Sequence, residues 1–336
     1  MSGPPNIDPQ SALAWELDVS QLGGTLPAVG ERQLIRLSFR NQRIEIAPAE
    51  TFDAATHQII HVRGEPFISH LSERDAVISR VLQHQGYWEF AESLLLATRM
   101  ERGSLVLDLG ANIGYYTLAA ARQLGPTGAV FAAEPDPANF VILLANVLLA
   151  VQRRGELARV DLQCVALDSE SGTKTLTRFQ RNLGLHTLFP PTSLHTSQGN
   201  LDQSISVSTT TLDDLRFGSP SRPAAIERRI HLIKADTQGA ELAILKGGCR
   251  TLASDRPLLC LEFEPSLSGE ARSLELLHWL ADHQYRECLF FYSTETDPLR
   301  MLRQFQSPLA VLSLEPLVRQ RRIGPFGTLL AYPCEL

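Results

Sequence analysis

The chain has 336 residues, of which 44% are hydrophobic and 20% charged, and its formal net charge is −6. This composition is typical of a globular protein with enough apolar material for a sizeable core. The negative charge argues against a nucleic acid partner, because contacts with a phosphate backbone require an excess of Lys and Arg on one face.

Two further properties bear on the cellular compartment. The five cysteines are odd in number and lack the spacing of metal ligands, so we expect a reduced, cytoplasmic protein without a metal site. No stretch of the sequence has the pattern of a signal peptide or reaches the roughly 18–20 apolar residues of a membrane span. We therefore expect no membrane partner, and a homodimer remains open.

Residues 1–85 are expected to form an N-terminal α+β extension that covers a substrate or forms an interface. Residues 34–39 and 43–46 alternate apolar and polar side chains on either side of a turn, which predicts a hairpin. Residues 73–85 then predict a helix with Ser72 as its N-cap.

The most informative stretch is VLDLGANIG, residues 106–114, an apolar strand that runs into Asp-x-Gly-x-x-x-Gly. The next apolar run, residues 129–133, ends at Glu134. A strand, a glycine turn, a helix and a second strand ending in an acid predict a nucleotide-binding half-unit, in which Glu134 accepts hydrogen bonds from two ribose hydroxyls. Only one glycine precedes the three-residue gap. This spacing favours S-adenosylmethionine over NAD, since a pyrophosphate needs bare backbone amides along the whole loop.

Downstream, the alternation of strands and helices continues with one interruption. Residues 159–167 predict another strand, which Asp168 follows. Residues 170–228 are rich in Ser, Thr, Gly and Pro and predict an insertion that overhangs the sheet. Residues 230–236 then have the length and apolarity of a buried parallel strand, and Asp236-Thr237-Gln238-Gly239-Ala240-Glu241 follows it before a helix.

These motifs, in this order, resemble the FkbM family of class I S-adenosylmethionine-dependent methyltransferases. The resemblance covers about residues 86–265 and rests on LDLGANIGYYTL, AAEPDPANF, TTTLDDL, IKADTQGAELAILKGG and PLLCLEFEP. It implies methyl transfer to oxygen atoms of sugars, polyketides and other small molecules, as in natural product biosynthesis. One departure is Gln238, where the family commonly carries an acid, and it weakens any case for a metal there.

The fold class that follows is α/β, a doubly wound, mostly parallel Rossmann-like sheet over residues 86–336, with closing antiparallel strands near the end of the chain. Ligands of such sheets lie beyond the carboxyl ends of the strands. We therefore expect the cofactor to contact the strand-end and loop residues Asp108, Gly110, Asn112, Gly114, Glu134, Pro135, Asp136, Asp168 and Asp236. Asp168 is equally compatible with a simple turn.

Three residues are candidates for the chemistry. Asp236 could orient the acceptor hydroxyl or touch the cofactor's ammonium group, although an N-cap role is the simpler alternative. Glu241 lies in the first turn of the next helix, where a carboxylate also offsets the dipole. His186, inside the insertion, is a candidate general base because its ordinary pKa is near neutrality. We expect residues 182–196 to form a mobile lid with His186 facing the acceptor.

Other charged residues have two interpretations. Lys234, inside an apolar strand, could pair with a neighbouring carboxylate or extend its ammonium group to solvent. Glu262 and Glu264 point to one face of a buried strand, so each must be paired or have a raised pKa. Tyr87, Trp88 and Glu89 precede the first strand, where family members often carry an aromatic–acid pair over the cofactor, though an aromatic pair is also typical of a core.

Two alternative functions remain open. One is a cofactor-binding protein that has lost catalysis. The presence of Gln238 in place of the family's acid is consistent with this alternative. The other is a nicotinamide-dependent oxidoreductase, which the single glycine and the lack of a Tyr-x-x-x-Lys pair disfavour.

Overall fold

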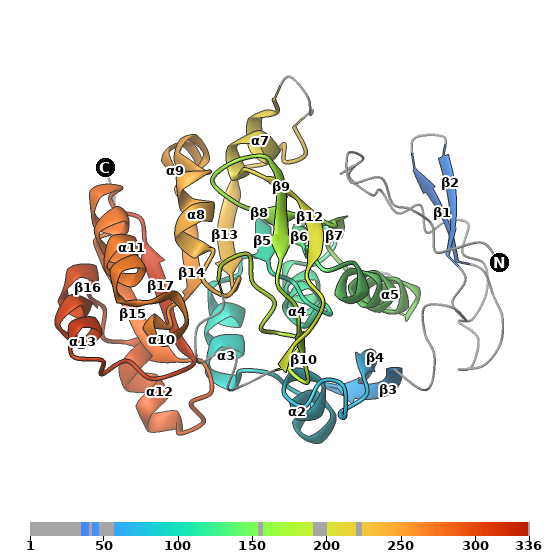
Figure 1. Cartoon of the computed structure of the whole chain (residues 1–336), viewed down its shortest axis with the longest axis horizontal. Coiled ribbons are helices and arrows are strands. Elements are labelled where there is room, and N and C mark those ends of the chain that lie inside the picture. The colour runs from blue at the N-terminus through green and yellow to red at the C-terminus, as the bar shows by residue number, and fades with distance from the viewer. Residues whose placement is uncertain are drawn as a thin grey trace.

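One eight-stranded sheet organises the molecule (Figure 1). The computed structural model describes residues 35–39, 42–46, 57–153, 157–190, 200–219 and 224–334. The strands run in the order β16-β15-β17-β14-β13-β5-β6-β7. Their bounds are β5 Leu105–Leu109, β6 Ala129–Ala133, β7 Arg159–Gln163, β13 Ile230–Ala235, β14 Leu258–Glu262, β15 Glu287–Tyr292, β16 Leu309–Ala310 and β17 Gly327–Tyr332.

The strand directions confirm the doubly wound fold. Strands β14, β13, β5, β6 and β7 are all parallel, whereas β15, β16 and β17 pair antiparallel at the other end. The first strand of the parallel set, β5, lies between β6 and β13, so the strand order reverses there. Such a switch point is where a doubly wound sheet leaves a crevice for a ligand.

Two apolar cores cover the two faces of this sheet, because residues along each strand alternate between the faces. Leu107 and Leu109 of β5 join one core and Val106 joins the other. The helices of the first core are α7 Leu212–Phe217, α8 Glu241–Lys246, α9 Cys249–Asp255, α11 Glu270–Asp282 and α13 Glu315–Arg319, with the 3-10 helix η2 Val311–Leu314. Those of the second are α2 Ile78–Gln85, α3 Phe90–Arg99, α4 Tyr115–Leu124, α5 Pro137–Arg153 and α12 Pro298–Phe305. The short helix α10 spans Pro265–Ser268.

The extension contains two hairpins. Strands β1, Ile35–Phe39, and β2, Gln42–Ile46, pair antiparallel as predicted. The second hairpin, β3 His57–Val62 with β4 Glu65–His70, was not predicted. It is fixed to α5 by the Asn146 side chain, which accepts from the amide of Ile68 at 2.7 Å and donates to its carbonyl at 2.9 Å. The division at residue 85 stays a prediction.

The helix predicted over residues 73–85 is shorter than expected. It begins at Ile78, and the amide of Ser79 in its first turn donates to the carboxylate of Asp75 at 2.8 Å. Ser72 is therefore not the N-cap, and its hydroxyl donates to Gln83 instead. The sequence pattern was wrong here because it favoured Ser72, the first residue with a capping side chain. In the fold, the side chain of the later residue Asp75 contacts the first turn of the helix.

Strands between residues 166 and 210 form two small sheets in front of the main one (Figure 1). The first contains β8 Ala166–Leu167, β12 Ile205–Thr210 and β9 Gly172–Leu176; the second pairs β10 Phe179–Gln180 with β11 Asn200–Leu201. That residues 170–228 are an insertion into the methyltransferase domain stays a prediction. Residues 191–196 of the predicted lid lie outside the described residues.

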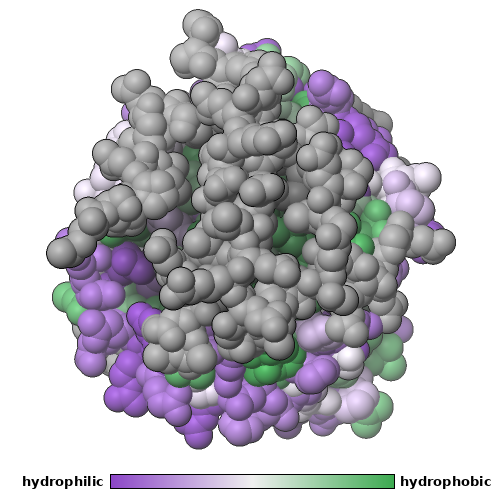
Figure 2. Space-filling model, turned by 90° about the vertical axis from the view of Figure 1, so that its right-hand side faces the viewer, coloured by the Kyte–Doolittle hydropathy of each residue, from purple (hydrophilic) through white to green (hydrophobic). Residues whose placement is uncertain are grey.

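One side of the molecule, seen in Figure 2, has mostly hydrophilic residues around its lower edge, with smaller apolar groups between them. Single exposed apolar residues are normal on a folded domain. In the ranges that the structure describes, no helix combines the length and apolarity needed to cross a membrane.

Candidate functional site

A cavity lies at the carboxyl ends of β5, β6 and β13, where the strand order reverses. Its floor comes from the loops after these strands and its roof from the insertion. Polar and loop residues of the lining are Gly110, Asn112, Glu134, Pro135, Asn139, Gly184, His186, Asp236, Thr237 and Gln238. Apolar lining residues include Leu109, Ala133, Val165, Leu167, Leu176, Leu183 and Leu188.

Gly110, in the loop after β5, is required by protein packing, and both glycines of this loop have a positive φ. Gly110 has a φ of +82°, and a Cβ there would lie 2.0 Å from the carbonyl oxygen of Asp236. Gly114 precedes the first residue of α4, and a Cβ there would lie 2.7 Å from Leu143 Cδ1. Gly110 thus approaches the end of β13 closely, which fixes the β5 loop against that strand, and it also lines the cavity.

Glu134 occupies the position expected for a ribose acid. It follows β6 directly, is only 5% exposed, and accepts the amides of Asn112 and Asp136 at 2.8 Å each. Burial, with the neighbouring Asp136 carboxylate, raises the pKa of Glu134 to about 8. Each carboxylate oxygen keeps a further lone pair for a donor inside the cavity.

Asp136 does not line the cavity but holds its roof. Its carboxylate binds Arg178 Nε at 2.7 Å and His186 Nε2 at 3.3 Å. His186 Nδ1 accepts the amide of Phe179 at 3.2 Å, so the hydrogen of the neutral ring lies on Nε2 and points to Asp136. Burial lowers the pKa of His186 to about 4. Both ring nitrogens are thus engaged within the protein, which leaves His186 no lone pair for an acceptor's proton.

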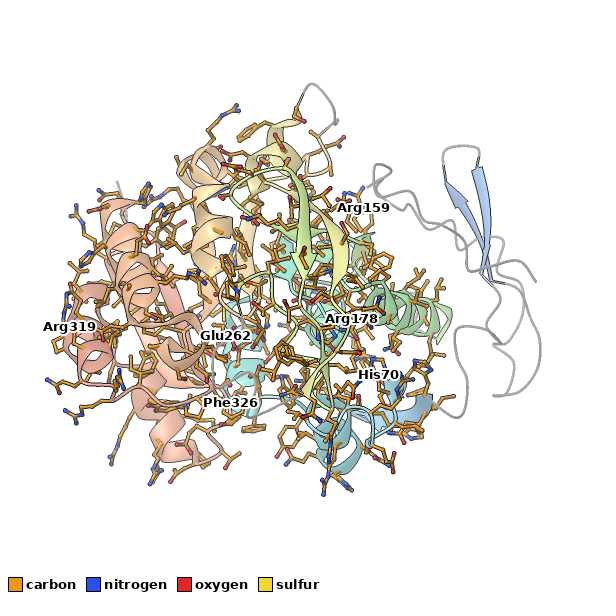
Figure 3. The ribbon with its side chains drawn as sticks, viewed as in Figure 1. His70, Arg159, Arg178, Glu262, Arg319 and Phe326 are labelled. Carbon is orange, nitrogen blue, oxygen red and sulfur yellow. The ribbon has the colours of Figure 1, made fainter. Side chains whose placement is uncertain are left out.

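Further contacts attach the roof to the floor. The hydroxyl of Thr187 donates to the carbonyl of Gln238 at 2.9 Å. The carbonyl of Leu183 accepts from the side chains of Asn112 at 3.4 Å and Asn139 at 3.5 Å. In Figure 3, Arg178 and His70 lie on the side of the molecule toward α5, while Glu262 lies nearer its centre.

Asp236 borders both this cavity and a second one. Its side chain is 30% exposed, pairs with Lys234 Nζ at 3.3 Å and accepts from Gln238 Nε2 at 3.3 Å. Lys234 is buried, and although burial alone would lower its pKa, the charges of Asp236 and Glu92 raise it above its usual range. Lys234 therefore pairs with carboxylates and does not reach solvent.

The second cavity is lined by Asp236 together with Glu89, Glu92, Lys234, Cys260, Glu262, Ser293, Phe326 and Thr328. Glu92 was missed in the sequence. A signal was present, since Glu92 precedes Leu95 and Leu96 by one helical turn and so shares their buried face.

The structure brings six of the predicted site residues to the first cavity. These are Gly110, Asn112, Glu134, Pro135, His186 and Asp236. The other five, Asp108, Gly114, Asp136, Asp168 and Glu241, do not line it. Besides Asp136, three of these five have structural partners of their own: Asp108 accepts from the Thr117 hydroxyl at 2.6 Å, Asp168 pairs with Lys174, and Glu241 accepts from the Thr237 amide and hydroxyl at 2.8 Å.

Glu262 is the last residue of β14, whereas Glu264 lies beyond the strand at the N-cap position of α10, so the prediction that both lie on one strand was wrong for Glu264. Glu262 accepts from the side-chain nitrogen of Gln238 at 2.8 Å, and Glu264 accepts the amide of Phe326 at 3.1 Å. Burial raises the pKa of both carboxyls. Among the described residues, no group of three or more His, Cys, Asp or Glu side chains is arranged to hold a metal ion.

Comparison with known proteins gives one family. The model of the Methyltransferase FkbM domain matches residues 108–287. The chain is 31% identical over 162 residues to Methyltransferase sdnD of Sordaria araneosa, and 26% identical over 156 residues to Methyltransferase 1 of Beauveria bassiana. These matches cover 42% and 43% of this chain and 59% and 58% of the two relatives, so the chain spans less than two thirds of the relatives' length.

Solved structures give distant matches. Methyltransferase FkbM of Methylobacillus flagellatus is 18% identical, with a TM-score of 0.34, and the match covers 54% of this chain and 39% of that one. An S-adenosylmethionine-dependent O-methyltransferase of Thermotoga maritima is 11% identical, with a TM-score of 0.37, and the match covers 96% and 99%.

Proposed function

Because the chain belongs to the FkbM methyltransferase family, as the match over residues 108–287 shows, we propose that it transfers a methyl group to a hydroxyl of a small molecule. The cofactor of this family is S-adenosylmethionine. The acceptor that we propose is a sugar or a polyketide-like natural product. The observation that carries the proposal is Glu134, a buried carboxylate at the edge of a cavity above the switch point of the sheet.

The first cavity fits this cofactor in charge and in polarity. Its described lining residues include the carboxylates of Glu134 and Asp236 and neither Lys nor Arg. Such a lining disfavours a pyrophosphate and suits a positively charged ligand. Glu134 would hold the ribose, and the apolar side chains of Val165 and Leu167 would contact the adenine.

The cofactor supplies a methyl group on a positively charged sulfur, which is already activated for transfer. The protein has to place the acceptor hydroxyl in line and to receive its proton. Asp236 is the residue that we assign to the hydroxyl, because it is the partly exposed carboxylate shared by both cavities. The roof, which residues 183–188 form, would exclude water from the methyl transfer.

The test is methyl transfer itself. Purified protein is incubated with S-adenosylmethionine carrying a ¹³C-labelled methyl group and a library of hydroxylated acceptors, and products are examined by NMR for an O-methyl signal. Products methylated on nitrogen or carbon would contradict the proposed position. Binding of S-adenosylhomocysteine without any turnover would favour the alternative, a cofactor-binding protein that has lost catalysis.

A further inference from the structure

Lys234 is a charged side chain that the proposed chemistry leaves unused. It lies inside β13, two positions before Asp236, and side chains two positions apart along a strand point to the same face of the sheet. Leu232, two positions earlier, packs in the second apolar core, and Lys234 itself is only 3% exposed. Burial strips the ammonium group of its hydration, which is costly unless opposite charges surround it.

The ammonium group lies among carboxylates and an aromatic ring. Its Nζ atom is 3.3 Å from Asp236 Oδ2, 3.7 Å from Glu92 Oε1 and 4.3 Å from the centre of the Tyr116 ring. In the strand register, Lys234 is also opposite Asp108 of β5. Although burial alone would lower the pKa of Lys234, the charges of these three carboxylates raise it above its usual range. The ammonium group therefore remains charged in the folded protein.

The side chain of Asp236 is held at both of its oxygens. Lys234 binds Oδ2, and Gln238 Nε2 donates to Oδ1 at 3.3 Å. The backbone amide of Asp236 donates to the carbonyl of Leu109 at 3.1 Å, which fixes the chain at the end of β13. With its side chain 30% exposed and bordering the first cavity, the carboxylate is held in one orientation and still accessible to a ligand.

Stability alone explains this arrangement poorly. Replacing a buried ion pair by apolar side chains of similar volume is often neutral or stabilising, because both charges must be desolvated. Among the carboxylates near Lys234, Asp236 lines the first cavity, whereas Glu92 and Asp108 do not belong to its described lining. The lysine thus supplies a fixed positive charge beside the carboxylate that we assign to the acceptor hydroxyl.

We propose that Lys234 is a positioning residue for methyl transfer, which keeps the Asp236 carboxylate ionised and turned toward the acceptor hydroxyl. This inference rests on the proposed function, because it requires that Asp236 receives this hydroxyl. As the bond from the methyl carbon to the acceptor oxygen forms and the bond to sulfur breaks, the hydroxyl proton passes to Asp236 and then to solvent. A carboxyl that already carried a proton could not accept it, so the neighbouring cation keeps the proton acceptor available.

The first test is the variant Lys234→Met, which removes the charge and keeps an unbranched side chain. With an acceptor that the hydroxyl library identifies, kcat should fall at least about tenfold, while the dissociation constant of S-adenosylhomocysteine stays within about threefold of wild type. The acid limb of kcat against pH should also move to higher pH, because a carboxylate without a neighbouring cation takes up a proton more readily. Lys234→Arg, which keeps the charge, should recover part of the lost kcat.

Glu92→Gln is the matched control in the same cluster. It removes the other ion-pair partner of Lys234 but leaves Asp236 and its contact with the lysine, and the amide can still accept from Thr328. Its kcat should stay within a few-fold of wild type, and its acid limb should not move to higher pH. If Lys234→Met does not fold, the double variant Lys234→Met/Glu92→Gln removes both charges and takes its place in the test.

A double-mutant cycle separates positioning from a structural role. Lys234→Met should cause no further loss of kcat in the background of Asp236→Asn, since the lysine then has no carboxylate there to act on. Losses that multiply in the double variant, an unchanged kcat in Lys234→Met, or a change in cofactor affinity larger than the change in kcat would each overturn the inference. If the wild-type protein binds S-adenosylhomocysteine but methylates no acceptor, the proposed function itself fails, whereas failure of the inference alone leaves wild-type turnover intact.

Discussion

Glu134 links cofactor binding to pH. Its folded pKa of about 8 means that the empty site holds a proton at neutral pH, whereas ribose hydroxyls donate to the ionised form. Binding must then release this proton below pH 8. The dissociation constant of S-adenosylhomocysteine should therefore rise by up to about tenfold per pH unit as the pH falls from about 8 to 6.

The matched variant Glu134→Gln tests this directly by calorimetry. We expect it to weaken binding by ~1.5–3 kcal/mol at the high end of the pH range, the contribution of hydrogen bonds to a charged group. Its affinity should also lose the pH slope, and the exposed Glu101→Gln should behave as wild type. An unchanged dissociation constant in Glu134→Gln would mean that another residue holds the ribose.

Gln238 occupies the place of a family acid, and its contacts show what an amide does there. Its side-chain nitrogen donates to Asp236 at 3.3 Å and to Glu262 at 2.8 Å. The amide therefore occupies two carboxylates that would otherwise be available as ligands for a hard cation. We predict that turnover survives dialysis against a chelator. In Gln238→Glu, Mg²⁺ should raise the thermal midpoint, with no such effect in the wild type. Chelator-sensitive activity restored by Mg²⁺ would point to Asp236 and Glu241 as ligands.

Two glycines with the same backbone conformation offer a matched test of packing. Gly64 and Gly110 have φ values of +80° and +82°, but a Cβ at Gly64 meets nothing within 4 Å, whereas one at Gly110 would overlap the carbonyl oxygen of Asp236. Gly64→Ala should cost about 1–2 kcal/mol, the penalty of the left-handed conformation. Gly110→Ala should cost at least ~3 kcal/mol more in urea unfolding. Equal losses would show that the β5 loop can move away from β13.

At the scale of elements, the roof over the cofactor cavity has its own prediction. His186 binds Asp136 and the Phe179 amide with its two ring nitrogens, so we expect His186→Ala to loosen the roof without removing a base. The KM for S-adenosylmethionine should rise while kcat stays within a few-fold, and the exposed His278→Ala should change neither. A kcat loss of roughly 10²–10⁴-fold at unchanged KM would restore His186 as the general base.

The elements differed in how far the sequence could predict them. Strands β5, β6 and β13 were predictable because continuous apolar runs are typical of parallel strands that helices cover on both faces. The hairpin of β3 and β4 was missed although its turn residues, Arg63 and Gly64, carry the positive φ values, 51° and 80°, of a two-residue hairpin turn. Arg is uncommon at such a position, so the pattern gave a weak signal.

The position of a site residue was predictable only where the residue directly follows a parallel strand, because the direction of the strand then fixes the edge of the sheet at which the residue lies. Glu134 directly follows β6, and the carboxyl ends of parallel strands share one edge of the sheet, so its place could be inferred. Asp108 lies inside β5, where alternation turns it toward Thr117 of α4. Asp136 meets Arg178 and His186 from the insertion, a contact across about 40–50 positions of chain that no local pattern encodes.

At the scale of the whole molecule, one sheet is shared by both apolar cores, and the first cavity lies at the carboxyl ends of its strands β5, β6 and β13. Strands β5 and β6 carry residues of each core, so loss of packing in one core also disrupts the packing of the other. We expect a single cooperative thermal transition for the domain, and a ligand that binds the folded form should shift that transition as a whole.

This coupling makes thermal stability a test of cofactor identity. At a concentration of 100 times its dissociation constant, S-adenosylhomocysteine should stabilise the folded protein by ≈ 2.7 kcal/mol, which raises the midpoint by roughly 5–10 °C for a domain of this size. NAD should leave the midpoint unchanged, because the described lining of the cavity has carboxylates at Glu134 and Asp236 and no Lys or Arg for a pyrophosphate. Scanning calorimetry of the wild type and Glu134→Gln gives both comparisons, and the shift should shrink in the variant at equal ligand concentration. A larger shift with NAD would contradict the assignment of this cavity to S-adenosylmethionine.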